Sequence, residues 1–90
     1  QRFEFTFELA WKTMKRALLV EGIVCKTPRE CLRESFRLGF INDEEKWLNM
    51  LDDRNAMSHI YYEKEARTIY DRLPDYQRAF ENLFTAIKGR

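Results

Sequence analysis

Two hydrophobic patterns overlap in the first twenty residues. From Phe3 to Leu9, apolar and polar residues alternate, which is typical of a half-buried strand. A longer stripe at helical spacing runs through the same segment. No later segment offers a strand for pairing, so we favour a helix that ends near Gly22. Its inward stripe is formed by Phe3, Phe7, Trp11, Met14 and Leu18.

This first helix has apolar residues on a second face as well. Phe5 and Leu9 lie four residues apart on nearly the opposite side from the stripe. The N-terminal half of the helix therefore needs cover on two sides, which an upstream helix or a partner subunit could supply. Because the chain also opens at Gln1 without a methionine, we expect an N-terminal helix to be missing from it.

The next helix has a clear start signal. Residues 27–30, Thr-Pro-Arg-Glu, combine an N-cap threonine, a proline at the first helical position and a glutamate that closes a capping box. The pattern predicts a helix that begins at residue 28 and stops near Gly39, with Leu32 and Phe36 facing inward. Residues 40–41, Phe-Ile, then form an apolar hinge.

A third helix follows the same capping logic. Asn42 is followed three residues later by Glu45, and acidic side chains fill the first turn, where the helix dipole favours them. We expect this helix to run towards Ser58 with a buried face made of Trp47, Leu48, Leu51 and Ala56.

The last segment predicts one long helix. From Tyr62 onward, apolar residues recur at alternating steps of three and four, and the register is the same before and after Pro74. We therefore expect a kinked helix and not two separate ones. Together these patterns predict an all-α fold, a single domain over residues 1–90 built as an antiparallel up-and-down helical bundle. The seam of the long helix is Ala66, Ile69, Leu73, Tyr76, Phe80, Leu83 and Ile87.

Composition narrows the function classes. Lys and Arg number 16 and Asp and Glu 15, so the net charge is +1, and no polybasic tract appears. Charge alone does not support nonspecific binding to nucleic acid or to anionic membranes. No apolar run is long enough to span a bilayer and no leader precedes the first helix, so we expect a cytoplasmic protein. Cys25 and Cys31 match no metal or redox spacing, and we expect two free thiols.

The residues that could carry chemistry gather around the single histidine, His59. One histidine cannot build a multi-histidine metal site, and a metal held by Asp52, Asp53 and His59 is disfavoured, so we expect no metal or cofactor. Histidine can move a proton near neutral pH, and the planar guanidinium of Arg54 matches phosphate oxygens. This pair suits cleavage of a phosphodiester without metal.

The spacing alone leaves two interpretations open. Residues five apart on a continuous helix differ in direction by about 140°, so Arg54 and His59 converge on one phosphate only if the helix ends before His59 or two copies meet there. Otherwise Arg54 pairs with Asp52 or Asp53 on the surface, and His59 caps the end of the helix. Tyr61 is either a core residue or an exposed hydroxyl beside Arg54.

These residues resemble a known family. The pattern Arg54-x4-His59-x-Tyr61 is similar to the Arg-x4-His-x-Tyr motif of HEPN-domain proteins. The flanking blocks FEFTFELAWKT (residues 3–13) and WLNMLDDRN (residues 47–55) resemble one branch of them, the small nucleotidyltransferase substrate-binding subunits that include the HepT toxins. The resemblance covers nearly all of the chain. Pro74, inside the long last helix, departs from the family pattern.

The resemblance implies a helical homodimer in which the motifs of both subunits line a shared cleft. By position, Arg54 would stabilise the scissile phosphate of RNA, His59 would transfer a proton, and Asn55 matches a polar residue that often follows the motif arginine. In toxin–antitoxin members, a minimal nucleotidyltransferase of the MntA type, encoded nearby, silences the toxin by transferring AMP to the motif tyrosine, here Tyr61. Added adenylate would place negative charge and bulk beside Arg54.

Three functions therefore stay open. The first is a HepT-like ribonuclease toxin with Arg54, Asn55 and His59 as catalytic residues. The second is a noncatalytic subunit that binds a nucleotide or presents a substrate to a partner nucleotidyltransferase. The third is a plain helical dimerisation module, in which the motif is incidental.

Overall fold

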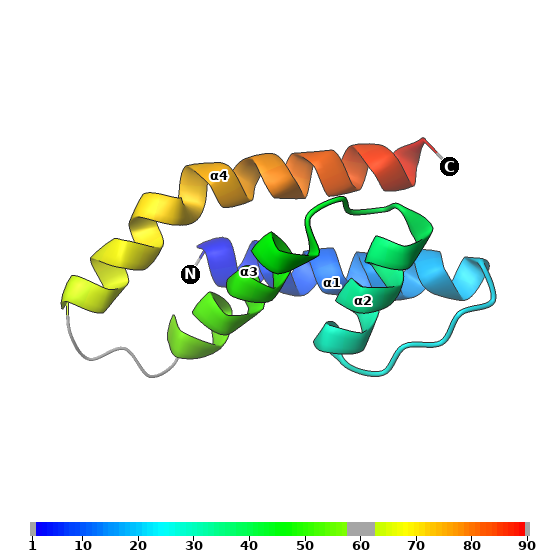
Figure 1. Ribbon diagram of the computed structural model, residues 1–90, viewed down its shortest axis with the longest axis horizontal. Helices are drawn as coiled ribbons and strands as arrows, with labels where there is room; N and C mark the ends of the chain where they lie inside the picture. The colour runs from blue at the N-terminus through cyan, green and yellow to red at the C-terminus, as the bar shows by residue number, and fades with distance from the viewer. Residues whose placement is uncertain (1, 58–62, 90) are drawn as a thin grey trace.

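The computed structural model describes residues 2–57 and 63–89, and these form four helices (Figure 1). They are α1 (Arg2–Val20), α2 (Pro28–Leu38), α3 (Glu44–Met57) and α4 (Glu63–Lys88). The predicted all-α bundle is confirmed. α2 and α3 form an antiparallel pair that packs against α1, and α4 lies along α1.

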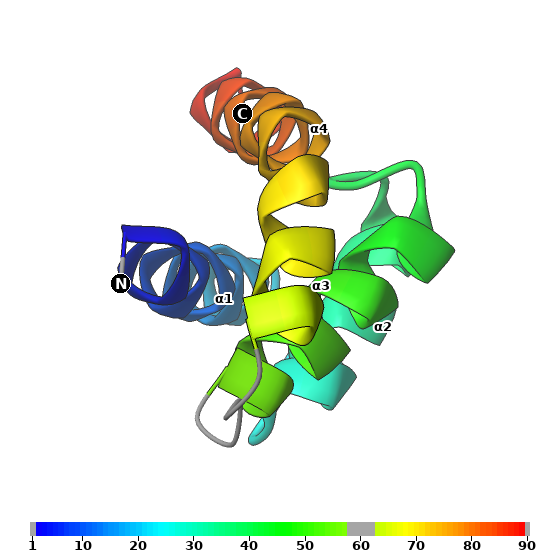
Figure 2. The ribbon, with the colours of Figure 1, turned by 90° about the vertical axis from the view of Figure 1, so that its left-hand side faces the viewer.

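One end of the bundle gathers three helices. The start of α1, the end of α3 and the start of α4 all lie at the left-hand end of Figure 1. Seen from that end, the last turns of α3 and the first turns of α4 are in front, with the start of α1 beside them (Figure 2). The end of α3, which precedes His59 in the sequence, therefore lies against both α1 and α4.

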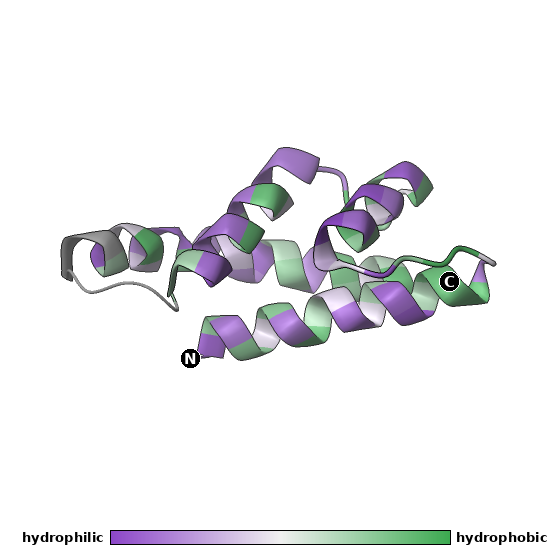
Figure 3. Cartoon of the chain, turned by 90° about the horizontal axis from the view of Figure 1, so that it is seen from below, coloured by the Kyte–Doolittle hydropathy of each residue, from purple (hydrophilic) through white to green (hydrophobic). Residues whose placement is uncertain are grey.

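α1 is a helix throughout its described length, so the strand interpretation of its first residues is wrong. Its inward stripe is buried much as predicted, except that Ala10 takes the fully buried place and Trp11 is half-buried. The outer face is not covered by any described part of the chain: Phe5 is 76% and Leu9 53% exposed. Figure 3 shows hydrophobic and hydrophilic positions together along α1.

Aromatic rings join α1 to α3, which carries Arg54 and Asn55, and to α4. Phe3 stacks on Tyr76 of α4, with ring centres 5.4 Å apart. Trp47 of α3 meets Phe80 of α4 edge to face at 5.6 Å, and Phe7 of α1 packs on Trp47. Such ring pairs add roughly 0.5–1.5 kcal/mol each to the free energy gained from burying their area. The core thus holds α1, α3 and α4 in one arrangement.

The turn after α1 corrects the prediction of free thiols. Gly22 adopts a φ of +82°, and the N–H of Ile23 donates to the carbonyl of Leu18, which closes a C-terminal cap. The chain then doubles back across the start of α2. This return brings Cys25 and Cys31 within 5.3 Å between Cα atoms, and they form a buried disulfide. The prediction of free thiols considered only the spacing of the two cysteines in the sequence, and this spacing does not show that the chain reverses between them.

α2 begins and ends as predicted, but one of the two residues predicted to face inward is exposed. The backbone N–H of Glu30 donates to Thr27 Oγ1, and the Glu30 carboxylate accepts from the Thr27 N–H, both at 3.2 Å. Gly39 ends the helix with a φ of +85°. Leu32 is buried as expected, whereas Phe36 is 43% exposed because the inward position in that turn belongs to Ser35.

α3 differs from the prediction by one residue at its start and in one inward position. The cap is Asp43, whose Oδ1 accepts from the N–H of Lys46 at 3.0 Å, and not Asn42. Trp47 and Leu51 are buried as predicted. Ala56 is exposed, because the inward positions at this end of the helix are taken by Asp53 and the half-buried Met57.

α4 runs without interruption through Pro74, as the register predicts. The helix is bent along its length (Figure 1), which is expected where a proline removes a backbone donor and crowds the preceding turn. Ile69, Tyr76, Phe80 and Leu83 are buried on its inner face. In the described part of the chain, no helix is both long and apolar enough to cross a membrane.

Candidate functional site

The structure places two of the four predicted site residues. Arg54 and Asn55 lie in the last turn of α3. His59 and Tyr61 lie outside the described residues, so their positions relative to Arg54 stay predictions. The described part of the site is the C-terminal end of α3, which precedes these two residues in the sequence.

The side chain of Arg54 reaches α1. Its Nη2 donates to Glu8 Oε2 in an ion pair, and its Nη1 donates to Asn55 Oδ1 at 3.2 Å. The Arg54 side chain is 30% exposed, so its guanidinium is held in place and still accessible. Surface pairing of Arg54 with its neighbours Asp52 or Asp53 is not what the structure shows.

Asp53 faces the interior and was missed at the level of sequence. It is 8% exposed, and both carboxylate oxygens accept from Arg72 Nη1 at 2.8 Å. The hydroxyl of Tyr76 also donates to Asp53 Oδ2, at 2.6 Å. The available signal was that Asp53 lies three residues after the buried Met50, on the inner face of α3. A carboxylate in that position needs donors, but the sequence does not say from which helix.

Asp52 completes a pattern of three consecutive residues that bind three different helices. Its Oδ1 lies 3.8 Å from Arg29 Nη2 of α2. Asp53 binds α4 and Arg54 binds α1. The side chains of Asp52 and Arg29 are both more than half exposed, so this ion pair contributes little to stability. The buried contact of Asp53 is the strong one, and it fixes the turn that carries Arg54.

The two donors of this network, Tyr76 and Arg72, keep their protons at neutral pH. Burial, together with the hydrogen bond to Asp53, raises the pKa of Tyr76 to about 12. The hydrogen bond to Asp53 also raises the pKa of Arg72 above its usual value. Tyr76 therefore stays neutral and Arg72 stays charged, so both continue to donate to the carboxylate.

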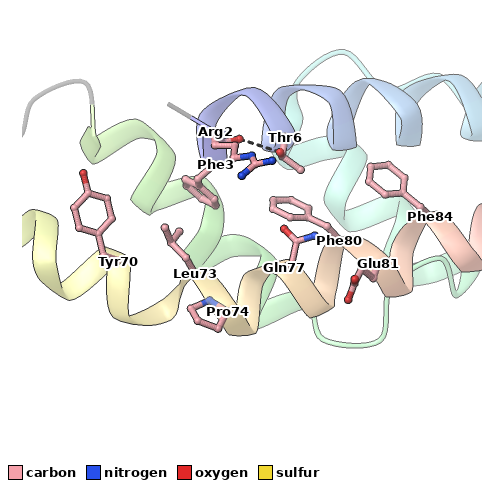
Figure 4. Close-up of a pocket in the computed structure, with 10 residues that line it drawn as sticks. All are labelled: Arg2, Phe3, Thr6, Tyr70, Leu73, Pro74, Gln77, Phe80, Glu81 and Phe84. Carbon is pink, nitrogen blue, oxygen red and sulfur yellow. Dashed lines mark hydrogen bonds between the residues drawn. The ribbon is translucent and has the colours of Figure 1, made fainter.

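A groove of the described surface lies away from Arg54. This groove, of about 690 Å³, runs between the start of α1 and α4, lined mostly by apolar and aromatic side chains (Figure 4). Neither Arg54 nor Asn55 lines this groove. Among the described residues, no three His, Cys, Asp or Glu side chains are grouped so that they could hold a metal ion. The main lining residues of the groove are Arg2, Phe3, Tyr70, Leu73, Pro74 and Phe80.

Comparison with known proteins gives the family. The model of the family described as "Nucleotidyltransferase substrate binding protein like" matches residues 1–89. The chain belongs to this family. It is also 37% identical, over its whole length, to a Haemophilus influenzae protein named as a probable ribonuclease HepT. The resemblance to the HepT-like branch of HEPN-domain proteins is therefore confirmed.

A solved structure supports the fold. A crystal structure of a Thermus thermophilus protein superimposes on 97% of this chain with a TM-score of 0.92 and 37% sequence identity. The chain spans 65% of the length of the Haemophilus protein and 76% of the Thermus chain. The activity and partners of a whole protein of this family are therefore matters for proposal.

The Tyr76 hydroxyl gives a prediction about alkaline pH. Its folded pKa lies above its ordinary value of 10, so the unfolded chain loses this proton first. The associated stabilisation is complete below about pH 10 and is lost as pH rises towards 12. We expect Tyr76→Phe to lower the free energy of unfolding by about 1–3 kcal/mol near neutral pH, since Asp53 loses a donor.

Denaturant titrations of the wild type and of Tyr76→Phe at a series of pH values would measure this. The gap between the two free energies should be constant up to about pH 10 and should narrow from there to about pH 12. A gap that stayed constant across that range would show that the hydroxyl does not titrate as the structure indicates.

Proposed function

We propose that this chain is a HepT-like toxin, a metal-independent ribonuclease that a partner nucleotidyltransferase silences by AMP transfer. The proposal depends mainly on one observation: Arg54 is held by Glu8 and Asn55 at the end of α3, directly before the segment that contains His59. The similarity to a probable ribonuclease HepT supports the same activity.

The chemistry needs two groups. In cleavage without metal, the 2′-oxygen of RNA attacks the adjacent phosphorus, the new O2′–P bond forms, and the P–O5′ bond breaks. A proton leaves the 2′-hydroxyl and another is delivered to the departing O5′. His59 is the group suited to proton transfer near neutral pH. Arg54 donates to the phosphate oxygens and stabilises the charge that develops on them.

Cooperation between Arg54 and His59 requires that the two residues do not lie on one continuous helix. The separation of about 140° applies only where one continuous helix carries both residues. α3 is described as far as Met57 and α4 from Glu63, so His59 lies between them, outside the described residues. We further propose that the active form is a cytoplasmic homodimer in which both copies of the motif line one cleft.

Silencing would act on Tyr61. The phenolic oxygen attacks the α-phosphorus of ATP, AMP is joined to it, and pyrophosphate leaves. The enzyme for this step is a minimal nucleotidyltransferase of the MntA type, and the family description supports a partner of this class. The new phosphate carries negative charge towards Arg54, where it would compete with RNA.

A second function is favoured by the family description itself. The chain could serve as a noncatalytic subunit that binds a nucleotide or substrate for its partner nucleotidyltransferase. This function uses the same Arg54 as a phosphate ligand but requires no turnover. The two functions differ in whether the purified chain cleaves RNA.

The first test exchanges one cation for another. We expect Arg54→Lys to reduce RNA cleavage strongly, by about 100-fold. Lysine keeps the positive charge, but it lacks the planar guanidinium that can bind two phosphate oxygens and Glu8 at the same time. Cleavage of a labelled single-stranded RNA would measure the loss. Arg33→Lys, on the exposed surface of α2, is the matched control and should leave the rate unchanged. Equal rates for Arg54→Lys and the wild type would refute the role of Arg54.

The second test is intact-protein mass after co-expression with the neighbouring nucleotidyltransferase. We expect mass gains in whole AMP units for the wild type and none for Tyr61→Phe. Tyr70→Phe is the control, since Tyr70 is a tyrosine of α4 that is 56% exposed, and it should gain mass like the wild type. A gain that persists in Tyr61→Phe would show that AMP is attached elsewhere and would contradict the assignment.

A further inference from the structure

Glu8 lies between two cations. Its Oε2 binds Arg54 Nη2, and its Oε1 lies 3.8 Å from Lys12 Nζ, one turn further along α1. The two cations therefore approach opposite oxygens of one carboxylate. The first helix thus contributes both a carboxylate and a second cation to the place where Arg54 is presented.

We propose that Lys12 and Arg54 form a two-cation site for successive phosphates of single-stranded RNA, with Glu8 as the residue that positions Arg54. This inference depends on the proposed function, which it extends from the end of α3 onto α1. Lys12 is a binding residue in it. Glu8 acts through Arg54 and does not itself contact RNA.

The charges and donors fit this assignment. Two cations and one carboxylate leave a net charge of +1, so the cluster attracts an anion even while the Glu8 pairs are intact. Within the described part of the chain, Glu8 and Asn55 take two of the five N–H donors of the Arg54 guanidinium, which leaves donors for a phosphate. Arg54 is therefore oriented by Glu8 and can still bind a second acceptor.

Exposure separates the roles of the two cations. The Lys12 side chain is 64% exposed, whereas that of Arg54 is 30% exposed. The ammonium of Lys12 can therefore turn to meet a neighbouring phosphate, while the guanidinium stays at a fixed point. A fixed planar group and a mobile point charge suit, respectively, the reacting phosphate and the one next to it.

The outer face of α1 continues the site. Phe5, Leu9 and Lys12 follow one another at steps of four and three residues, so they lie along one stripe of the helix. Phe5 and Leu9 are 76% and 53% exposed. An exposed ring beside cations is how single-strand binding proteins hold bases while the backbone follows the charges. This arrangement fits single-stranded RNA as the ligand of this face.

The binding test uses salt dependence. The probe is a short fluorescein-labelled single-stranded RNA, titrated with the full chain in a His59→Ala background to prevent cleavage, at about 50 to 200 mM salt. Removal of one phosphate contact should reduce the slope of log Kobs against log[salt] by about 0.7. We expect this reduction for Lys12→Gln and not for Lys88→Gln, an exposed lysine in the last turn of α4. Equal slopes for Lys12→Gln and the background protein would overturn the role of Lys12.

The positioning role of Glu8 is tested by kinetics. Glu8→Gln removes a negative charge, so general electrostatics would make RNA bind more tightly and react at least as fast. Loss of positioning instead lowers kcat by about 10- to 100-fold without raising KM. Glu8→Asp should recover part of the loss. Glu21→Gln, which removes an exposed charge just after α1, should leave kcat unchanged. An unchanged kcat for Glu8→Gln would refute the positioning role.

The outcomes separate this inference from the proposed function. If the wild type neither binds nor cleaves the RNA, the proposed function fails and the inference fails with it. If the wild type binds and cleaves but Lys12→Gln keeps the full salt slope, only the two-cation site is refuted, and the outer face of α1 is then a protein-docking surface. Melting curves of each variant show whether a loss reflects unfolding.

Discussion

The buried carboxylate of Asp53 holds the end of α3 in place. It accepts hydrogen bonds from Arg72 and Tyr76 of α4, and the ring of Tyr76 in turn stacks on Phe3 of α1. The last turn of α3 is therefore joined to α4 by polar contacts and through the same tyrosine to α1. Arg54 follows Asp53 directly in the chain, so its backbone is fixed before its side chain makes any contact.

The contacts at this turn differ in strength, and the differences have a consequence for function. Hydrogen bonds that involve a charged group and are shielded from water are worth more than exposed ion pairs. Asp53 is buried, Arg54 and Glu8 are about one third exposed, and Asp52 and Arg29 are largely exposed. Among the described residues, the turn is thus anchored by a buried contact, and its outer contacts are exposed to solvent. A phosphate can approach Arg54 from that side without disturbing the anchor.

The features that the sequence predicted are local. The capping box of α2 depends on residues three apart, and the continuity of α4 through Pro74 depends on a register that neighbouring residues share. The errors concern faces and partners. Phe36 and Ala56 are exposed because the position of an apolar residue on a short helix is ambiguous by one step, and the Cys25–Cys31 disulfide depends on a chain reversal.

The contacts that form the candidate site could not be predicted in the same way. Arg54 and Glu8 are 46 positions apart, and Arg72 and Asp53 are 19 apart. Their pairing depends on how α1 and α4 pack on α3, which no local pattern records. Arg54 was identified from its guanidinium near the single histidine and from the family motif, whereas Glu8 and Asp53 lie in the flanking blocks without a chemical signal that names their partners.

Cleavage of a single-stranded RNA by the purified chain in the presence of a metal chelator, compared with His59→Ala, is the most direct test of a metal-independent ribonuclease. The wild type should cleave the RNA. His59→Ala should lose cleavage by at least about 100-fold, the range of a lost general acid or base, while its circular dichroism and melting temperature stay unchanged. Undiminished cleavage by a folded His59→Ala protein would contradict the assignment of His59, and no cleavage by the wild type would contradict the ribonuclease function itself.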